Sequence, residues 1–182
     1  GMPLRLFRIS FSGELGYEIN VPAGYARAFA DHLMEVGAAF DITPYGSEAL
    51  DVMRIEKGHV TAKELNGQTT PHDLGLGRMV SQKKDYIGRF LSGRPGMIDA
   101  NRQRIVGLVP ERAGARLFAG AHLVGLGKSA IAKNDEGFVT SVTYSPALGH
   151  WIGLALVNGG EARIGDKMRA IEGLRGMEED VE

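Results

Sequence analysis

The sequence predicts an α+β fold in which a partial α/β domain, made of a hairpin plus two helices, precedes a small antiparallel β-barrel. Three patterns predict this class. Strand-like runs flank a glycine-rich turn near the N-terminus, apolar residues recur at helical spacing over residues 24–57, and short strand-like runs follow residue 103. A Gly- and Pro-containing linker precedes residue 97. We therefore expect two domains, residues 2–97 and 98–182.

The first predicted element is a hairpin around residues 11–18, whose sequence is Phe-Ser-Gly-Glu-Leu-Gly-Tyr-Glu. Its two glycines permit the backbone angles of a tight turn. Alternation along the second strand places Glu18 on the face opposite Tyr17 and Ile19. If that face lines a cavity, Glu18 is a carboxylate directed at a ligand. Otherwise the hairpin simply has one solvent-exposed face.

Two amphipathic helices are expected next. The first runs over residues 24–36, where apolar residues recur every three or four positions and Gly37 ends the pattern. The second begins at Ser47, a residue type that caps helices, and ends at Lys57 before Gly58. Arg54 lies at the border of its apolar stripe. An arginine there extends to solvent or pairs with a carboxylate; the alternative is that it points into the same cavity as Glu18.

The remaining sequence predicts loops, two short elements and the barrel. Turn signals dominate residues 63–78, and we expect a short strand at 79–81 and a short helix at 85–91. The acidic tail ends where another strand could begin, so we expect the second domain to be cut short. The predicted barrel strands are 104–109, 121–124, 137–143 and 151–157, and the predicted barrel core is Leu117, Phe118, Phe138 and Trp151.

Composition narrows the classes of function. The net charge of −1 gives no electrostatic footprint for nucleic acid or for an anionic membrane, and no apolar run is long enough to span a bilayer. Without cysteine there is no disulfide, thiolate metal site or cysteine nucleophile, and we expect a cytoplasmic protein. The five histidines lack metal-ligand spacing. A Gly-Leu-Gly-Lys-Ser run ending at Ser129 is not a phosphate-binding loop, because His122 stands where the motif needs glycine.

Five ordered motifs carry a resemblance that covers nearly the whole chain. They occupy residues 8–19, 44–58, 69–77, 85–89 and 139–149. With these motifs the sequence resembles the aminomethyltransferase family, the T-protein of glycine cleavage and its relatives. The resemblance implies a folate-binding first domain, present only in its C-terminal part, and the family's C-terminal barrel.

Within that family, the Thr-Thr-Pro-x-Asp-Leu-Gly-Leu-Gly run at 69–77 and the run at 149–156 look most like the C-terminal part of heterotetrameric sarcosine oxidase alpha subunits. This resemblance implies a tetrahydrofolate-binding module of one-carbon metabolism. It would convert a sarcosine-derived imine and tetrahydrofolate to glycine and 5,10-methylenetetrahydrofolate. FAD or FMN and NAD would be bound only in other parts of the full complex. Folate and the other oxidase subunits, or the N-terminal part of the alpha subunit, are the implied partners.

The resemblance also implies roles for individual residues. Glu18 matches the family glutamate that pairs with the pterin head, where an exocyclic amino group and a ring N–H offer two parallel donors to a carboxylate. Arg54 matches an arginine near the same ring. Phe11 stands where many relatives have tyrosine, so its ring can pack on the ligand without a hydroxyl hydrogen bond. Together with Tyr17, these residues form the expected folate-binding set.

Differences between this sequence and the family leave alternative functions open. The family's catalytic aspartate lies before the start of this chain, so no residue here is assigned that role, and we expect an incomplete chain that is inactive alone. The alternative is a stand-alone folate-binding or structural assembly module without transferase activity. A folate-binding protein of iron–sulfur cluster repair is a further rival, but such relatives carry cysteine after the Lys-Gly pair, where this chain has His59.

Overall fold

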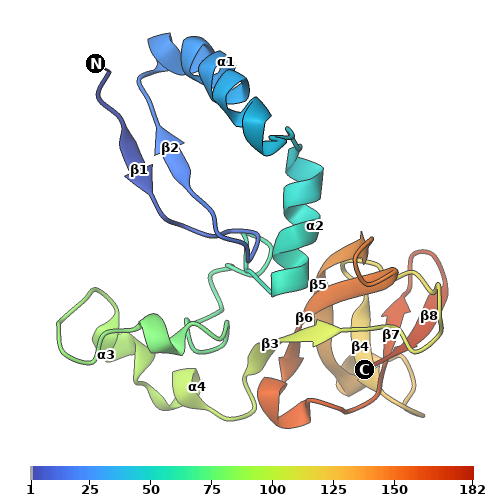
Figure 1. Ribbon diagram of the computed structural model, residues 1–182. Coiled ribbons are helices and arrows are strands. Elements are labelled where there is room, and N and C mark those ends of the chain that lie inside the picture. The colour runs from blue at the N-terminus through green and yellow to red at the C-terminus, as the bar shows by residue number, and fades with distance from the viewer. Residues whose placement is uncertain (1) are drawn as a thin grey trace. The chain divides into compact units, whose positions relative to one another are not determined.

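The computed structural model describes residues 2–182, which divide into two compact units, one ending at Lys57 and the other beginning at Gly58. The predicted α+β class is confirmed: the first unit combines a hairpin with helices, and the second contains a six-stranded antiparallel sheet (Figure 1). None of the helices in this part of the chain has both the length and the apolar character needed to cross a bilayer.

The first unit contains a two-stranded sheet and two α-helices. Strand β1 pairs antiparallel with β2, and Phe7 lies opposite Glu18. Helix α1 ends at Gly37, as predicted, although a 3-10 turn follows it, which ends at Asp41 in the left-handed conformation. The bounds are β1 Arg5–Phe7, β2 Glu18–Asn20, η1 Ala23–Tyr25, α1 Ala26–Gly37, η2 Ala38–Phe40 and α2 Ser47–Lys57.

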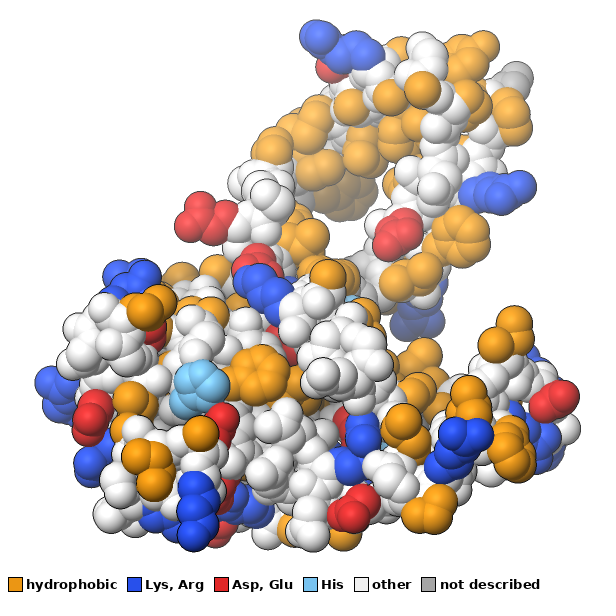
Figure 2. Space-filling view, turned by 180° about the vertical axis from the view of Figure 1, so that it is seen from behind, with side chains coloured by type: hydrophobic (Ala, Val, Ile, Leu, Met, Phe, Trp, Pro, Cys, Tyr) orange, Lys and Arg blue, Asp and Glu red, His pale blue; other side chains and the backbone are white. Residues whose placement is uncertain are grey.

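The first unit buries few of its side chains. Arg54 and Ile55 of α2 are buried, whereas apolar side chains of the hairpin and α1 remain exposed. The space-filling view shows hydrophobic side chains crowded over α1 (Figure 2). Both faces of β2 are exposed, since Glu18 and Ile19 are both accessible to solvent. A two-stranded sheet is marginally stable without a layer packed on it.

The second unit begins with an irregular segment, residues 58–102. Its elements are η3 Gly77–Met79, α3 Arg89–Ser92 and α4 Pro95–Ile98. The predicted strand at 79–81 is wrong, because the Val80 N–H is used in a local turn to Gly77. The predicted helix at 85–91 is too long: Gly88 has φ +91°, a left-handed conformation that lets the helix begin only at Arg89.

Residues beyond 102 form the barrel. The strands are β3 Gln103–Leu108, β4 His122–Gly125, β5 Asp135–Ser145, β6 His150–Asn158, β7 Met168–Glu172 and β8 Met177–Val181; two short helical turns are η4 Ala132–Asn134 and η5 Gly160–Arg163. Their order in the sheet is β3-β6-β5-β4-β7-β8, and every neighbouring pair is antiparallel. The residues after β3 pair with the end of β8 through a bridge between Pro110 and Val181, which closes the barrel.

The barrel surrounds one apolar cluster, and a second lies outside it. The main cluster includes Leu117, which is 1 % exposed, and Trp151 packs against it. Phe138 instead packs on the second cluster, where β5 and β6 meet residues of the 58–76 segment. Phe118 is only half-buried, and the Arg116 guanidinium lies 5.0 Å from its ring centroid. The four residues of the expected core therefore lie in three places. Leu117 and Trp151 belong to the main cluster, Phe138 belongs to the second cluster, and Phe118 stacks with Arg116 near the surface.

Polar contacts also join the 58–102 segment to the barrel. The carboxylate of Glu64, which is fully buried, accepts hydrogen bonds from the hydroxyls of Thr140 and Ser141 on β5 and from the Thr61 N–H. Residues 58–102 thus pack with the barrel in one compact unit. A division of the sequence between residues 97 and 98 stays a prediction.

Candidate functional site

The connection between β1 and β2 is held in shape by local hydrogen bonds. The Ser10 hydroxyl oxygen accepts a 3.0 Å hydrogen bond from the Gly13 N–H, and Gly13 has φ +99°. A Cβ atom on Gly16 would lie 2.7 Å from the Ile9 carbonyl oxygen, so only glycine fits there. Glycine is therefore required at Gly13 by the backbone conformation and at Gly16 by the lack of space for a Cβ atom.

The same connection is tethered to α2. The Lys57 ammonium lies 3.4 Å from the Ser10 carbonyl oxygen, and its side-chain carbons pass within 3.3 Å of the position that a Gly13 Cβ would take. The last residue of α2 thus supports the turn. An open depression of about 480 Å³ lies here, lined by Arg8, Ser10, Gly13, Glu14, Leu15 and Gly16.

Three of the four predicted site residues lie on the hairpin or its connection. Glu18 begins β2 and is exposed, and its carboxylate forms no hydrogen bond or ion pair within residues 2–182. Tyr17 precedes it and is 54 % exposed, while Phe11 is half-buried in the connection. The carboxylate and the tyrosine ring are therefore both accessible to a ligand.

Arg54 has a different environment. Its side chain is fully buried on α2, and its Nε donates a 2.6 Å hydrogen bond to Asp51 one turn earlier. Pairing with a carboxylate is one of the alternatives that the sequence left open for this arginine. Within residues 2–182 there is no hydrogen bond or ion pair between Arg54 and Glu18.

The site offers one clear chemical capability. An ionised carboxylate has acceptor oxygens only, so Glu18 can accept two parallel N–H bonds from a ligand. Hydrogen bonds to a charged group contribute about 1.5–3 kcal/mol each when the pair excludes water. The described chain holds no group of three or more side chains suited to a metal ion.

Glu64 and Asp73 are among the buried carboxylates of the second unit that were not predicted to be functional candidates. Glu64 accepts hydrogen bonds from hydroxyls of β5, and Thr61-x-x-Glu64 has the spacing of a helix capping box, in which the Thr61 N–H donates to the Glu64 carboxylate. Asp73 could have been found in the same way, because Thr70-x-x-Asp73 has the same spacing. The Thr70 N–H donates to Asp73, and the Asp73 N–H to the Thr70 hydroxyl. Burial by itself would raise the pKa of Asp73, but hydrogen bonds from Arg102 and Thr70 hold that pKa below its ordinary value.

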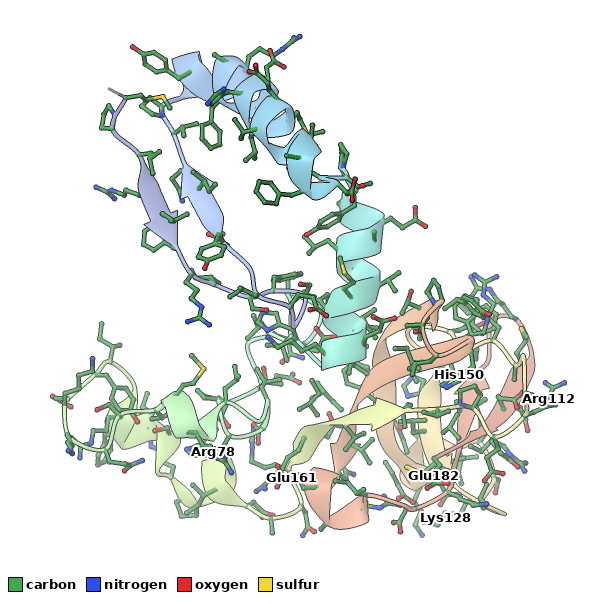
Figure 3. All side chains as sticks on the ribbon, in the orientation of Figure 1. Arg78, Arg112, Lys128, His150, Glu161 and Glu182 are labelled. Carbon is green, nitrogen blue, oxygen red and sulfur yellow. The ribbon has the colours of Figure 1, made fainter. Side chains whose placement is uncertain are left out.

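The loop that resembles a phosphate-binding loop has a structural role instead. Lys128 pairs with Glu136, and Arg163 pairs with the same carboxylate. Hydrogen bonding from Lys128 outweighs the effect of burial and, with Arg163, lowers the pKa of Glu136. The labelled Lys128 belongs to the turn after β4 (Figure 3).

Comparisons with known proteins all match the same group of relatives. Residues 1–84 match the family described as the GCVT N-terminal domain, and residues 103–174 match the glycine cleavage T-protein C-terminal barrel domain. The sarcosine oxidase alpha subunit of Rhizobium meliloti is 49% identical over 172 residues, which are 94% of this chain and 17% of that protein. An aminomethyltransferase of Cutibacterium acnes is 37% identical over 92% of this chain and 43% of its own length.

A solved structure supports the fold. Aminomethyltransferase T of the glycine cleavage system from Bartonella henselae superposes with a TM-score of 0.72 and 24% identity, over 97% of this chain and 47% of that one. The chain therefore spans less than half of the aminomethyltransferases it matches and less than a fifth of the sarcosine oxidase alpha subunits.

Proposed function

The chain belongs to the aminomethyltransferase family, and on that premise we propose that it is the tetrahydrofolate-binding, one-carbon-transfer region of a sarcosine oxidase alpha subunit. The observation that carries the proposal is the 49% identity to such a subunit along almost the whole chain. The family relationship implies the use of tetrahydrofolate, which accepts a one-carbon unit when bound. The proposed products are glycine and 5,10-methylenetetrahydrofolate, from a sarcosine-derived imine.

The residues present fit the pterin head of tetrahydrofolate. Glu18 supplies an accessible carboxylate without an internal partner, which suits the two parallel donors of the pterin edge. The neighbouring Tyr17 supplies an exposed ring, and Phe11 a half-buried one. In this proposal Arg54, paired with Asp51, supports the helix beside the hairpin connection. No residue of this chain is assigned the role of catalytic acid or base.

The proposed partners follow from the same relationship. Relatives named as alpha subunits of sarcosine oxidase suggest assembly with the other subunits, and the flavin and NAD would be bound in other parts of that complex. We place this activity in the cytoplasm. The absence of cysteine suits a reducing compartment, where disulfides add no stability.

Calorimetric titration of the whole chain with tetrahydrofolate tests the proposal. Glu18→Gln should weaken binding at least tenfold, because a neutral amide accepts with one oxygen only. The matched control is Glu14→Gln on the hairpin connection, which should bind within twofold of the unchanged chain. Equal affinity of all three proteins would remove Glu18 from pterin recognition. A chain that binds no tetrahydrofolate in any form would contradict the proposal for this region on its own.

The second candidate is a folate-binding or assembly module without transferase activity. It is favoured by the exposed apolar side chains of the first unit, such as Leu6 at 57 % and Val36 at 49 %. Interfaces commonly use such surfaces. The test is to assemble the Glu18→Gln variant of this chain with the other oxidase subunits. Normal assembly together with an unchanged rate of methylene transfer would support this candidate over the first.

A further inference from the structure

A pocket of about 400 Å³ lies within the 58–102 segment of the second unit. One wall is the turn at Pro71 and His72, and the other is formed by residues that lead from η3 into α3. Its apolar lining comes from Met79, Val80 and Ile87, with the ring of Tyr86 beside them. Sites for small molecules have volumes of about 300–1,000 Å³ and are mostly apolar, so this pocket has the size and lining of such a site.

The first wall is anchored to the barrel. His72 precedes Asp73, which is buried and bound by Arg102 at the entry to β3. A Cβ atom on Gly77 would lie 2.5 Å from Nδ1 of His72, so the imidazole ring packs directly against the Gly77 backbone. The ring is therefore held at the pocket by its neighbours in the structure.

Local hydrogen bonds shape the second wall. The Ser81 hydroxyl oxygen accepts hydrogen bonds from the N–H of Lys83 at 3.3 Å and the N–H of Lys84 at 3.2 Å. Gly88, with φ +91°, then allows the chain to turn into α3. The side chain of Lys84 lines the pocket, and none of the described residues that line it is acidic. Lys84 and His72 thus bring basic groups to an otherwise apolar site.

The chain around the pocket is strongly basic. Residues 77–96 contain five lysines and arginines against one acidic residue, Asp85, whereas the whole chain has a net charge of −1. In the barrel, by contrast, Arg163 and Arg169 each pair with two carboxylates. Within residues 2–182 no ion pair is formed by the five basic residues, which are Arg78, Lys83, Lys84, Arg89 and Arg94. The labelled Arg78 belongs to η3 (Figure 3).

Large apolar side chains accompany these charges. Met79, Ile87 and Phe90 expose most of their surface to solvent. Hydrophobic and basic side chains gather at the lower right of Figure 2, over this part of the second unit. Uncompensated positive charge attracts anions, and an apolar lining favours an alkyl or aryl group. A ligand that combines the two matches the pocket better than either alone.

We propose that this pocket binds a small organic anion, a phosphate or carboxylate carried on an alkyl or aryl group. The apolar group lies against Met79, Val80 and Ile87, where its removal from water is favourable. The anionic head receives charge-assisted hydrogen bonds from the Lys84 ammonium and from an N–H of the His72 ring. The inference goes beyond the proposed function, because every residue that it uses lies in the second unit and Glu18 has no part in it.

Amide NMR of the whole ¹⁵N-labelled chain with hexyl phosphate tests the proposal. The amide resonances of Ser81, Lys84 and Gly88 should show saturable shifts. Hexylamine carries the same alkyl group on a cation, and inorganic phosphate lacks the alkyl group, so each should bind at least tenfold more weakly. Hexanoate should shift the same amides, and the tighter binder of the two acids identifies the preferred head group. Equal binding of hexyl phosphate and hexylamine would overturn the proposal.

Two neighbouring lysines separate a direct contact from a general attraction. Both are exposed, but Lys84 lines the pocket and Lys83 does not. Lys84→Gln should weaken the binding of hexyl phosphate at least fivefold, and Lys83→Gln by no more than twofold. The control Lys133→Gln removes an exposed lysine of η4 and should leave the affinity unchanged. Equal losses in Lys83→Gln and Lys84→Gln would indicate a diffuse field rather than a site and refute the proposal.

Further measurements test the apolar part of the pocket and its independence from folate. Ile87→Ser should weaken the binding of hexyl phosphate at least fivefold and leave the binding of inorganic phosphate unchanged. Glu18→Gln should bind hexyl phosphate as the unchanged chain does, so failure of the folate proposal would leave this one intact. Phosphatidylserine vesicles that broaden the same resonances at concentrations lower than hexyl phosphate requires would assign the segment to a membrane surface and refute the pocket.

Discussion

Arg102 binds Asp73 with a fork of hydrogen bonds: its Nε lies 3.1 and 3.0 Å from the two carboxylate oxygens, and its Nη2 lies 2.6 Å from Oδ2. The remaining donors of the same guanidinium reach the carbonyl oxygens of Gly96 and Gln68. Asp73 is 2 % exposed and the Arg102 side chain 20 %. One arginine at the entry to β3 thus secures the Thr-Pro-containing loop and the linker before the barrel.

Asp73→Asn should destabilise the second unit by about 2–4 kcal/mol, because removing one member of a buried pair leaves the other charge poorly compensated. Urea unfolding followed by circular dichroism measures the change. The control is Asp166→Asn, which loses an ion pair with Arg163 from a side chain that is 54 % exposed and should cost at most about 1 kcal/mol. Equal losses in the two variants would show that burial of the Asp73 pair is energetically unimportant.

The same carboxylate predicts a dependence of stability on pH. Burial opposes ionisation, but hydrogen bonds from Arg102 and Thr70 lower the pKa of Asp73 in the folded state below its unfolded value. A depressed pKa stabilises the fold above the unfolded pKa and loses that stabilisation as pH falls through the folded one. The difference in unfolding free energy between the unchanged chain and Asp73→Asn should therefore be constant from pH 6 to 8 and shrink below about pH 4. A difference that grows in acid would contradict this assignment.

Glu64 should be as important to the second unit as Asp73. Glu64→Ala removes the acceptor for two hydroxyls of β5 and the Thr61 N–H, and we expect a loss of about 3 kcal/mol. Glu64→Gln keeps the volume and one acceptor oxygen, so its cost should be about half as large. Differential scanning calorimetry can rank the two against Glu161→Ala, an exposed control expected to change stability by less than about 0.5 kcal/mol. If Glu64→Ala left the stability unchanged, water would have to replace the carboxylate as the hydrogen-bond acceptor.

Replacing two glycines of the barrel by alanine should have different effects on its stability. A Cβ on Gly137 in β5 would lie 2.2 Å from the Leu156 carbonyl oxygen, an impossible contact that the paired strands must relieve by moving. We expect Gly137→Ala to cost about 2–3 kcal/mol. Gly107→Ala in β3 meets open space and should be neutral or slightly stabilising. Hydrogen exchange of the β5 and β6 amides would locate the damage, and similar exchange in both variants would refute the steric argument.

Elements with strong local signals were predictable from sequence. The predicted bounds of the second helix, residues 47–57, are those of α2, because Ser47 begins it and Gly58, with φ +77°, can leave the helical conformation without strain. The four expected barrel strands also occur, each within two residues at either end. Alternating apolar residues and flanking glycines were sufficient for them.

The missed strands show where pattern reasoning fails. β8 reads Met-Glu-Glu-Asp-Val and resembles a solvated tail, yet its carboxylates pair with arginines outside it: Asp180 and Glu178 with Arg169, and Glu179 with Arg112. Those partners lie on β7 and in the loop after β3, so the stabilising charges are invisible in a local window. The acidic tail therefore completes the barrel through contacts that only the tertiary fold creates.

The site was predictable only in part. Alternation gave the side of β2 on which Glu18 lies, but it could not tell what covers that side, which depends on segments distant in sequence. Arg54 was assigned to a border position and is instead fully buried beside Asp51. The resemblance supplied the role of Glu18, and that role stays a prediction until folate binding is measured.

The position of Trp151 has a practical consequence for every measurement on this protein. It is the only tryptophan, and it packs against the barrel cluster, while the first unit contains tyrosines but no tryptophan. Its emission spectrum consequently reports on the barrel unit alone. Melting curves can be recorded by tryptophan fluorescence and by circular dichroism, which reports on the whole chain. If the two units unfold independently, the two midpoints will differ, and the difference will measure the cooperativity between the units.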